Sequence, residues 1–211
     1  MTRAASSRGG RAALAPVVAA LLMLAAGSAR ATDVTPAGDD PATAAERVSR
    51  DASGFQVEGR RVVRAPLPIV WEVLTDYEGI PGFVSSMRES RITGRGERHL
   101  VVEQAAVGRL FMFSRRMHVT LFVEEIPPTT IRFEDVVGND FEDYRGEWRI
   151  EPRGDAVEIV YRLAARPSFS VPDFIARRLF RRMARDLLDQ VKMEIERCAA
   201  RAPAAARAAF R

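Results

Sequence analysis

The chain has 211 residues, of which 47% are hydrophobic and 28% charged, and this composition suits a domain with a buried core. Residues 1–31 hold four of the 32 basic residues and none of the 28 acidic ones, so the rest of the chain is electrically neutral. Neutrality argues against nucleic-acid binding, which needs a net basic surface, and the single cysteine, Cys198, excludes an intramolecular disulfide.

The first 31 residues have the pattern of a secretory signal peptide. Three arginines precede an apolar stretch over 12–26, and Ala29-Arg30-Ala31 follows as a cleavage site of small residues. We therefore expect export, cleavage after Ala31, and a periplasmic or secreted mature protein. An uncleaved N-terminal anchor is the alternative, although the apolar stretch is short for a membrane span.

Three further regions are distinguished by composition. Residues 32–52 are rich in Ala, Pro, Asp and Thr without a sustained period, which predicts a flexible tether. Residues 53–200 show no repeat and no internal linker, so we expect one domain there. Residues 201–211, mostly Ala and Arg, are expected to form a disordered tail.

The predicted domain begins with a strand over 54–65, where apolar and polar residues alternate until Pro66. Two short helical segments follow, over 69–77 and 83–87, and glycine and proline separate them. Six strand patterns come next, over 87–93, 99–107, 110–126, 130–138, 141–151 and 156–166. The breaks between them are short and made of turn residues, which favours antiparallel hairpins over parallel crossovers.

A long amphipathic pattern over 171–200 ends the domain. Apolar residues recur there with a helical period, and they are Ala176, Leu179, Phe180, Met183, Ala184, Leu187, Leu188, Val191, Ile195 and Cys198. Ser170 and Asp173 predict a capping box, with Pro172 in the first turn. So wide an apolar face needs a large apolar partner, which predicts a helix laid across the concave side of an antiparallel sheet. An ordinary core helix is the alternative.

Four short motifs accompany this order of elements. They are Asp76-Tyr77 with Ile80-Pro81-Gly82-Phe83, Pro127-Pro128 before Ile131-Arg132-Phe133, Gly146-Glu147-Trp148, and Pro167 with Pro172. Their order over 53–197 resembles the START-like (SRPBCC) superfamily, in the polyketide cyclase/dehydrase and lipid-transport branch that includes coenzyme Q-binding START-like proteins. The resemblance implies an α+β helix-grip fold. In it a curved antiparallel sheet of about seven strands wraps around a long C-terminal helix, and two short helices follow the first strand.

The resemblance also implies an apolar cavity between the sheet and the last helix. Cavity walls need large apolar side chains with a few polar groups that orient a ligand. Ten residues are candidate ligand-binding residues, namely Phe83, Met87, Phe113, Met117, Phe133, Tyr144, Trp148, Tyr161, Met183 and Leu187. The alternative for each is that it fills an ordinary core.

No residue pattern predicts a catalytic residue, a metal site or a cofactor. His99 and His118 are the only histidines and lack the spacing of metal ligands, and no serine-nucleophile or phosphate-binding motif is present. His118 is out of phase with the apolar row of its strand and is expected to face solvent. Asp135 shares the phase of Ile131 and Phe133, so it could act as a base if it projected into the cavity. The alternative, which we favour, is that it lies at the wetter end of the sheet or pairs with a surface arginine.

We therefore expect a protein that binds a hydrophobic small molecule, such as a lipid, an isoprenoid quinone or a polyketide-like compound. A cyclase/dehydrase-like enzyme using the same cavity and an interaction module with a filled cavity are the alternatives. From Ala176 onward the chain holds ten Lys or Arg against four Asp or Glu, which favours either a solvated helix face or contact with an anionic membrane. The sequence leaves the oligomeric state open.

Overall fold

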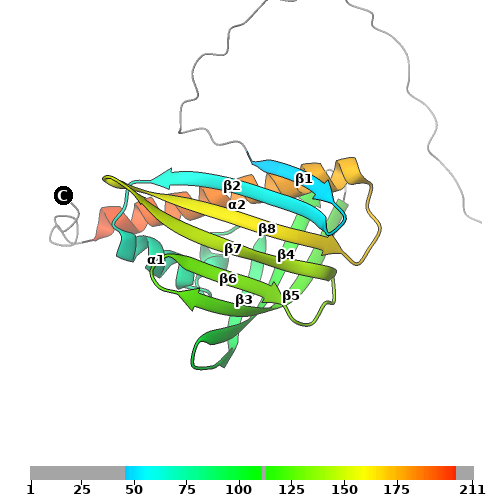
Figure 1. Cartoon of the computed structure of the whole chain (residues 1–211), viewed down its shortest axis with the longest axis horizontal. Helices are drawn as coiled ribbons and strands as arrows, with labels where there is room; N and C mark the ends of the chain where they lie inside the picture. The colour runs from blue at the N-terminus through cyan, green and yellow to red at the C-terminus, as the bar shows by residue number, and fades with distance from the viewer. Residues whose placement is uncertain (1–45, 111–112, 203–211) are drawn as a thin grey trace, which may run out of the picture. The chain divides into compact units, whose positions relative to one another are not determined.

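Eight strands form one antiparallel sheet (Figure 1), and apolar and polar side chains alternate in most of them. The computed structural model describes residues 46–110 and 113–202, without the side chains of residues 109, 110 and 113. All of these residues belong to the unit Asp39–Arg211. The elements are β1 (Arg47–Asp51), β2 (Gly54–Val63), α1 (Leu67–Thr75), the 3-10 turn η1 (Ile80–Gly82), β3 (Met87–Arg95), β4 (His99–Leu110), β5 (Phe113–Ile126), β6 (Thr130–Asp135), β7 (Phe141–Arg153), β8 (Ala156–Pro167) and α2 (Asp173–Arg201).

The strand order is β1-β2-β8-β7-β6-β5-β4-β3. The strands from β3 to β8 follow one another as antiparallel neighbours, and β2 pairs with β8. The segment with α1 and η1 carries the chain from β2 to β3 at the other end of the sheet. In Figure 1, β4 and β5 run steeply behind β6 to β8, as expected in a strongly twisted sheet, and α2 lies behind β2 and β8. The predicted α+β helix-grip fold is confirmed.

The helix α2 lies against the concave face of the sheet. Its buried residues are Ala176, Ala184, Leu188, Val191, Ile195 and Ala199, and the helical period predicted all of these except Ala199. The helix approaches β2 closely at Gly59, where a Cβ atom would lie 2.5 Å from Leu188 Cδ1. A glycine at this position therefore allows the helix to rest directly on the strand.

The N-terminus of α2 differs from the predicted capping box. Pro172 occupies the N-cap position and no side chain caps the free amides. Asp173 instead forms an ion pair with Arg50 at the end of β1. The carboxylate is thus used to join the helix to the sheet edge, a partner that local sequence spacing does not reveal.

Part of the predicted tether is a strand. β1 pairs with β2, and Val48, opposite Val57, is buried between the sheet and α2. Glu46, just before β1, is also buried and forms ion pairs with Arg61 and Arg185. The sequence of β1 has only one inward apolar residue and therefore shows no strand pattern. Contacts with residues far along the chain hold it in the sheet. The sheet therefore has eight strands and not about seven.

Two of the strand ends that differ from the expected ones have a local cause. β6 ends at Asp135 because its carboxylate accepts hydrogen bonds from the N–H groups of Val137 and Gly138, and Gly138 has a φ of +72°. β4 continues through Gly108, which was expected to be a turn residue. A Cβ atom there would lie 3.2 Å from Met117 Cε, so this glycine makes room for packing.

The predicted signal peptide over 1–31 and nearly all of the predicted tail over 201–211 lie outside the described residues. Within residues 46–110 and 113–202, no helix combines the length and apolar character needed to cross a bilayer.

Candidate functional site

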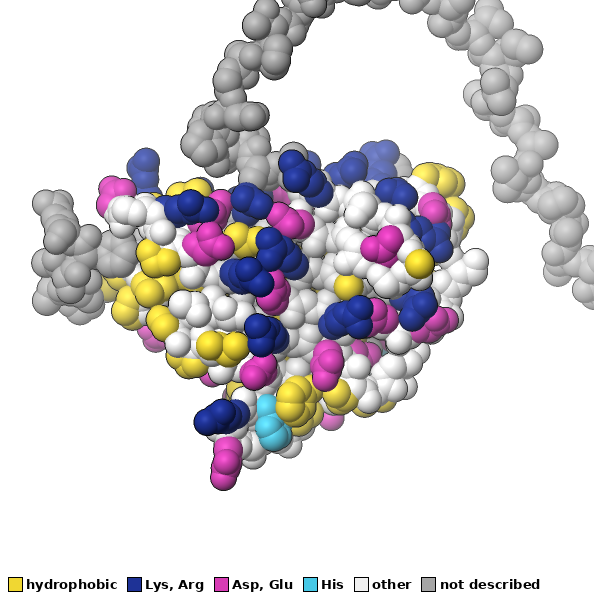
Figure 2. All heavy atoms as spheres, in the orientation of Figure 1, with side chains coloured by type: hydrophobic (Ala, Val, Ile, Leu, Met, Phe, Trp, Pro, Cys, Tyr) yellow, Lys and Arg dark blue, Asp and Glu magenta, His cyan; other side chains and the backbone are white. Residues whose placement is uncertain are grey.

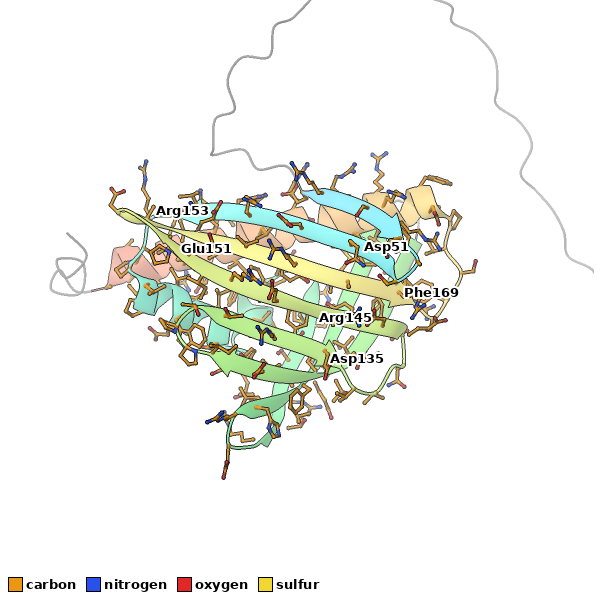
Figure 3. All side chains as sticks on the ribbon, in the orientation of Figure 1. Asp51, Asp135, Arg145, Glu151, Arg153 and Phe169 are labelled. Carbon is orange, nitrogen blue, oxygen red and sulfur yellow. The ribbon has the colours of Figure 1, made fainter. Side chains whose placement is uncertain are left out.

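Two adjoining chambers lie between the sheet and the helices. The first, which we name the α1 chamber, has a volume of about 120 Å³ and is walled by α1, η1 and the centre of the sheet. The second, which we name the α2 chamber, has a volume of about 130 Å³ and lies beneath the first half of α2. Phe169, from the connection between β8 and α2, also lines the α2 chamber and is labelled in Figure 3.

Nine of the ten residues proposed from the sequence line these chambers. Phe83, Phe133 and Trp148 line the α1 chamber, Met117 and Met183 line the α2 chamber, and both are lined by Met87, Tyr144, Tyr161 and Leu187. Phe113 begins β5, and its side chain lies outside the described part of the chain. The geometry brings the nine together, and their role in ligand binding stays a prediction.

Aromatic rings from three neighbouring strands form much of the wall. The Trp148 and Tyr161 ring centroids lie 4.6 Å apart, and those of Phe141 and Tyr144 lie 4.7 Å apart. The Phe133 ring centroid is about equally far from those of Tyr144 and Tyr161, at 6.1 and 6.3 Å. These rings provide a large, rigid apolar surface.

The hydroxyl groups of Tyr144 and Tyr161 interact with each other inside this aromatic cluster. Burial raises the pKa of Tyr144, and the negative charge of Asp135 raises it further, while the interaction with Tyr161 acts in the opposite direction. Burial also raises the pKa of Tyr161 well above its ordinary value, and Tyr144 adds to this shift. Both phenols are therefore protonated at neutral pH and serve as hydrogen-bonding groups rather than as bases.

Three polar lining residues were not proposed from the sequence, and they are Ser86, Gln104 and Tyr77. Gln104 lines both chambers and donates from Nε2 to the Ser90 hydroxyl at 3.2 Å. Tyr77 lines the α1 chamber and donates its hydroxyl to Glu125 Oε1 at 2.8 Å, which joins the end of α1 to β5. Burial, and then Glu125, raise the pKa of Tyr77. Gln104 lies two residues after Val102, which faces inward. This shared phase is the sequence signal that could have identified Gln104.

Asp135 does not belong to either chamber wall. Its carboxylate accepts hydrogen bonds from the backbone N–H groups of Thr120 at 3.0 Å and of Val137 and Gly138, each at 3.2 Å. Figure 3 labels it at the end of β6, where the chain leaves the sheet. The Asp135 side chain therefore shapes the connection from β6 to β7. This structural role accounts for its position, and no catalytic role is needed to explain it.

His118 faces solvent, as its phase predicted, and its side chain is 55% exposed. Its backbone N–H donates to Asp140 at 2.9 Å, and Arg115 donates to the same carboxylate at 3.0 Å. Burial alone would raise the pKa of Asp140, but these donors hold it below its ordinary value. The group therefore forms a structural contact at the surface, away from the chambers.

Cys198 does not have the properties of a nucleophile. Burial and the neighbouring Glu194 raise the pKa of its thiol, which therefore stays protonated at neutral pH. In the described part of the chain, no three His, Cys, Asp or Glu side chains meet in a group that could hold a metal ion.

A wider hollow of about 620 Å³ lies on the opposite, outer face of the sheet. Charged side chains line it, among them Arg162, which forms ion pairs with Glu58 at 3.2 Å and Glu147 at 3.0 Å. Figure 2 shows basic and acidic side chains interspersed over this face, and Arg145 is labelled on it in Figure 3. Such a mutually paired surface is typical of a solvated sheet face. The uncharged chambers are thus the better candidate site, although they are smaller.

The part of the chain that lines the chambers also matches a known protein family. Residues 63–192 match the family model for polyketide cyclase/dehydrase and lipid transport proteins. No curated protein sequence matches the chain.

Solved structures share its fold at low sequence identity. TTHA0849 from Thermus thermophilus has a TM-score of 0.60 and 20% identity, over 70% of this chain and 99% of that one. The Zhui aromatase/cyclase from Streptomyces sp. R1128 has a TM-score of 0.56 and 20% identity, over 67% and 93%. A STAR-related lipid transfer protein from Xanthomonas axonopodis has a TM-score of 0.55 and 16% identity, over 71% and 98%. At such identities the likeness shows the fold alone.

Proposed function

Since the chain belongs to the polyketide cyclase/dehydrase and lipid transport family, we propose that it binds and carries a hydrophobic small molecule between its sheet and α2. The resemblance drawn from the sequence is thereby confirmed at the level of family and fold. The ligand itself, a lipid, an isoprenoid quinone or a polyketide-like compound, belongs to the proposal.

One observation carries this proposal: the two chambers are lined by large apolar and aromatic side chains from almost every element of the domain. Burial of apolar ligand surface would stabilise a complex by roughly 25 cal/mol per Å², before the costs of ordering. The chambers are each smaller than the several hundred Å³ typical of ligand pockets. A long lipid would therefore require movement of α2 or of the segment around η1.

The geometry supports carriage over catalysis. The ionisable groups among the described lining residues are the three tyrosines, and the pKa of each is raised. Acid/base chemistry at neutral pH needs a group whose pKa lies near the working pH. The presence of two chambers also argues against an interaction module with a completely filled core.

We also propose that the protein is exported by its N-terminal segment and acts in the periplasm or outside the cell. The sequence pattern over 1–31 supports this proposal. Contact with an anionic membrane through α2 is a second part of it, supported by the exposed arginines Arg178, Arg181 and Arg182. Such a contact would place the chambers near a source of apolar ligand.

Native mass spectrometry of the protein, purified from the exported fraction of its own source, tests the proposal. We expect a chain that begins at Thr32 and an additional mass that organic solvent extracts as an apolar compound. A chain that still carries residues 1–31 would contradict cleavage. Protein without additional mass that also fails to bind a neutral apolar fluorophore would contradict carriage.

A further inference from the structure

The residues shared by the two chambers have an unusual polarity. Six residues line both, and they are Val84, Met87, Gln104, Tyr144, Tyr161 and Leu187. Three of the six carry polar groups, whereas the remaining lining of each chamber is almost entirely apolar. The boundary between the chambers is therefore their most polar part, and a ligand that fills both would place its middle there.

Neither chamber has a charged residue among its described lining side chains. A carboxylate or phosphate placed there would lose its hydration without gaining a cationic partner, and this cost is large in an apolar environment. A cationic group placed there would likewise lose its hydration without gaining a carboxylate partner. The lining therefore selects an uncharged ligand.

The boundary can nevertheless form hydrogen bonds. Tyr144 and Tyr161 both lie at this boundary, and each phenol has one proton to donate. Even with one hydroxyl donating to the other, the pair keeps one proton for a ligand oxygen. Gln104 donates from Nε2 to the Ser90 hydroxyl, so its amide carbonyl is the group that can accept a hydrogen bond from a ligand hydroxyl.

The size of the chambers limits the apolar parts of the ligand. Their volumes, about 120 and about 130 Å³, are close to that of a protein cavity of roughly 150 Å³ that accepts benzene. Each chamber is thus suited to one ring or to a branched chain of similar bulk.

We propose that the ligand is an uncharged molecule with two compact apolar parts, joined at a carbonyl or hydroxyl oxygen that hydrogen-bonds to the Tyr144–Tyr161 pair. This inference rests on the proposed carrier function and narrows its ligand class. It also assigns Tyr144 and Tyr161 as the residues that distinguish an oxygenated ligand from a hydrocarbon of the same shape.

Three probes of similar shape test the inference by displacement of the neutral fluorophore N-phenyl-1-naphthylamine from the protein. Benzophenone has two rings joined at a carbonyl, diphenylmethane lacks the oxygen, and diphenylacetate carries a carboxylate. In the double variant Tyr144→Phe/Tyr161→Phe, we expect benzophenone affinity to fall about fivefold, the effect of one lost hydrogen bond, while diphenylmethane affinity does not fall. We expect diphenylacetate to bind at least about tenfold more weakly than benzophenone to the unaltered protein.

Tyr77→Phe is the matched control, because it removes a third buried hydroxyl that Glu125 already holds. Any effect of this change should be equal for benzophenone and diphenylmethane. An unchanged far-UV circular dichroism spectrum and melting transition report that the double variant is folded. Equal loss of both neutral probes in the double variant, an unchanged benzophenone affinity, or tight binding of diphenylacetate would overturn the inference and leave the carrier function standing. Failure of the fluorophore and of all three probes to bind would overturn the carrier function itself.

Discussion

At the scale of single residues, Glu46 shows how a carboxylate is accommodated under a packed helix. Its side chain is 1% exposed, and it accepts hydrogen bonds from Arg61 at 2.6 Å and Arg185 at 3.1 Å. Arg61 also pairs with Asp189 at 2.7 Å, so the network joins the start of β1 to β2 and α2. Burial by itself raises the pKa of Glu46, but the two arginines outweigh it and hold the pKa below the ordinary value of 4.5.

We predict that Glu46→Gln lowers the free energy of unfolding at neutral pH by about 1–3 kcal/mol, because Arg61, which is mostly buried, loses a charged partner. The folded-state pKa lies below the unfolded value, so the carboxylate contributes its stability above about pH 4.5 and loses it as the pH falls through the folded-state pKa. The difference between the two proteins should therefore shrink below that pH.

Urea unfolding at neutral and acidic pH measures this prediction. Glu124→Gln is the matched control, since its ion pair with Arg132 at 3.4 Å is about half exposed, and we expect a change within about 0.5 kcal/mol. A loss in Glu46→Gln no larger than in this control would show that the network contributes little.

At the scale of elements, the position of α2 depends on its close approach to β2. Leu188 is completely buried and lies over Gly59, the residue at which a Cβ atom would be too close. Gly59 lies inside β2 and pairs with Tyr161 of β8. A glycine weakens the interior of a strand, and the contact with Leu188 explains why glycine occupies this position. It also sets the distance between helix and sheet, and hence the space that remains for the chambers.

We predict that Gly59→Ala lowers the free energy of unfolding by about 1–3 kcal/mol through overpacking, and that Leu188→Ala lowers it by about 2–5 kcal/mol through a cavity. Because the new methyl group occupies part of that cavity, the double variant should lose less than the two single losses added together. Thermal and urea unfolding give these values. Gly82→Ala, where a Cβ atom meets no atom within 4 Å, should change stability by less than about 0.5 kcal/mol. Additive losses would contradict the proposed contact.

At the scale of the whole molecule, an apolar side chain and basic residues gather at one end of α2. Phe174 is 74% exposed in the first turn of α2, and Arg178, Arg181 and Arg182 are exposed in the turns that follow. The α2 chamber lies beneath the same half of the helix. An aromatic side chain beside several arginines is the combination that inserts into a lipid surface carrying negative charge.

We predict that the protein co-sediments with vesicles of phosphatidylcholine and phosphatidylglycerol more than with phosphatidylcholine alone, and that salt weakens the binding. Phe174→Ser should reduce vesicle binding several-fold, because it removes the inserted ring. Met193→Ser is the matched control, since Met193 is 63% exposed farther along the same helix and should not contact the lipid. Equal effects of the two substitutions would rule out the start of α2 as the contact.

The sequence by itself determined the elements whose period is repeated over many residues. Alternation in β5 and β8 and the helical period of α2 report which face is buried, because inward positions are mostly apolar. For this reason the period placed Met117, Tyr161, Met183 and Leu187 on inward faces, whereas the cavity was implied only by the family resemblance.

Only the tertiary structure decided what depends on partners far along the chain. β1 is a strand because Glu46 and Val48 are held by β2 and α2, and its own five residues carry no period. The phase of Asp135 left open whether it faces the cavity or lies at the wetter end of the sheet, and backbone N–H groups hold its carboxylate at the end of β6. The meeting of Tyr144 and Tyr161 at the chamber boundary follows from the pairing register of β7 and β8, which is set by the whole sheet.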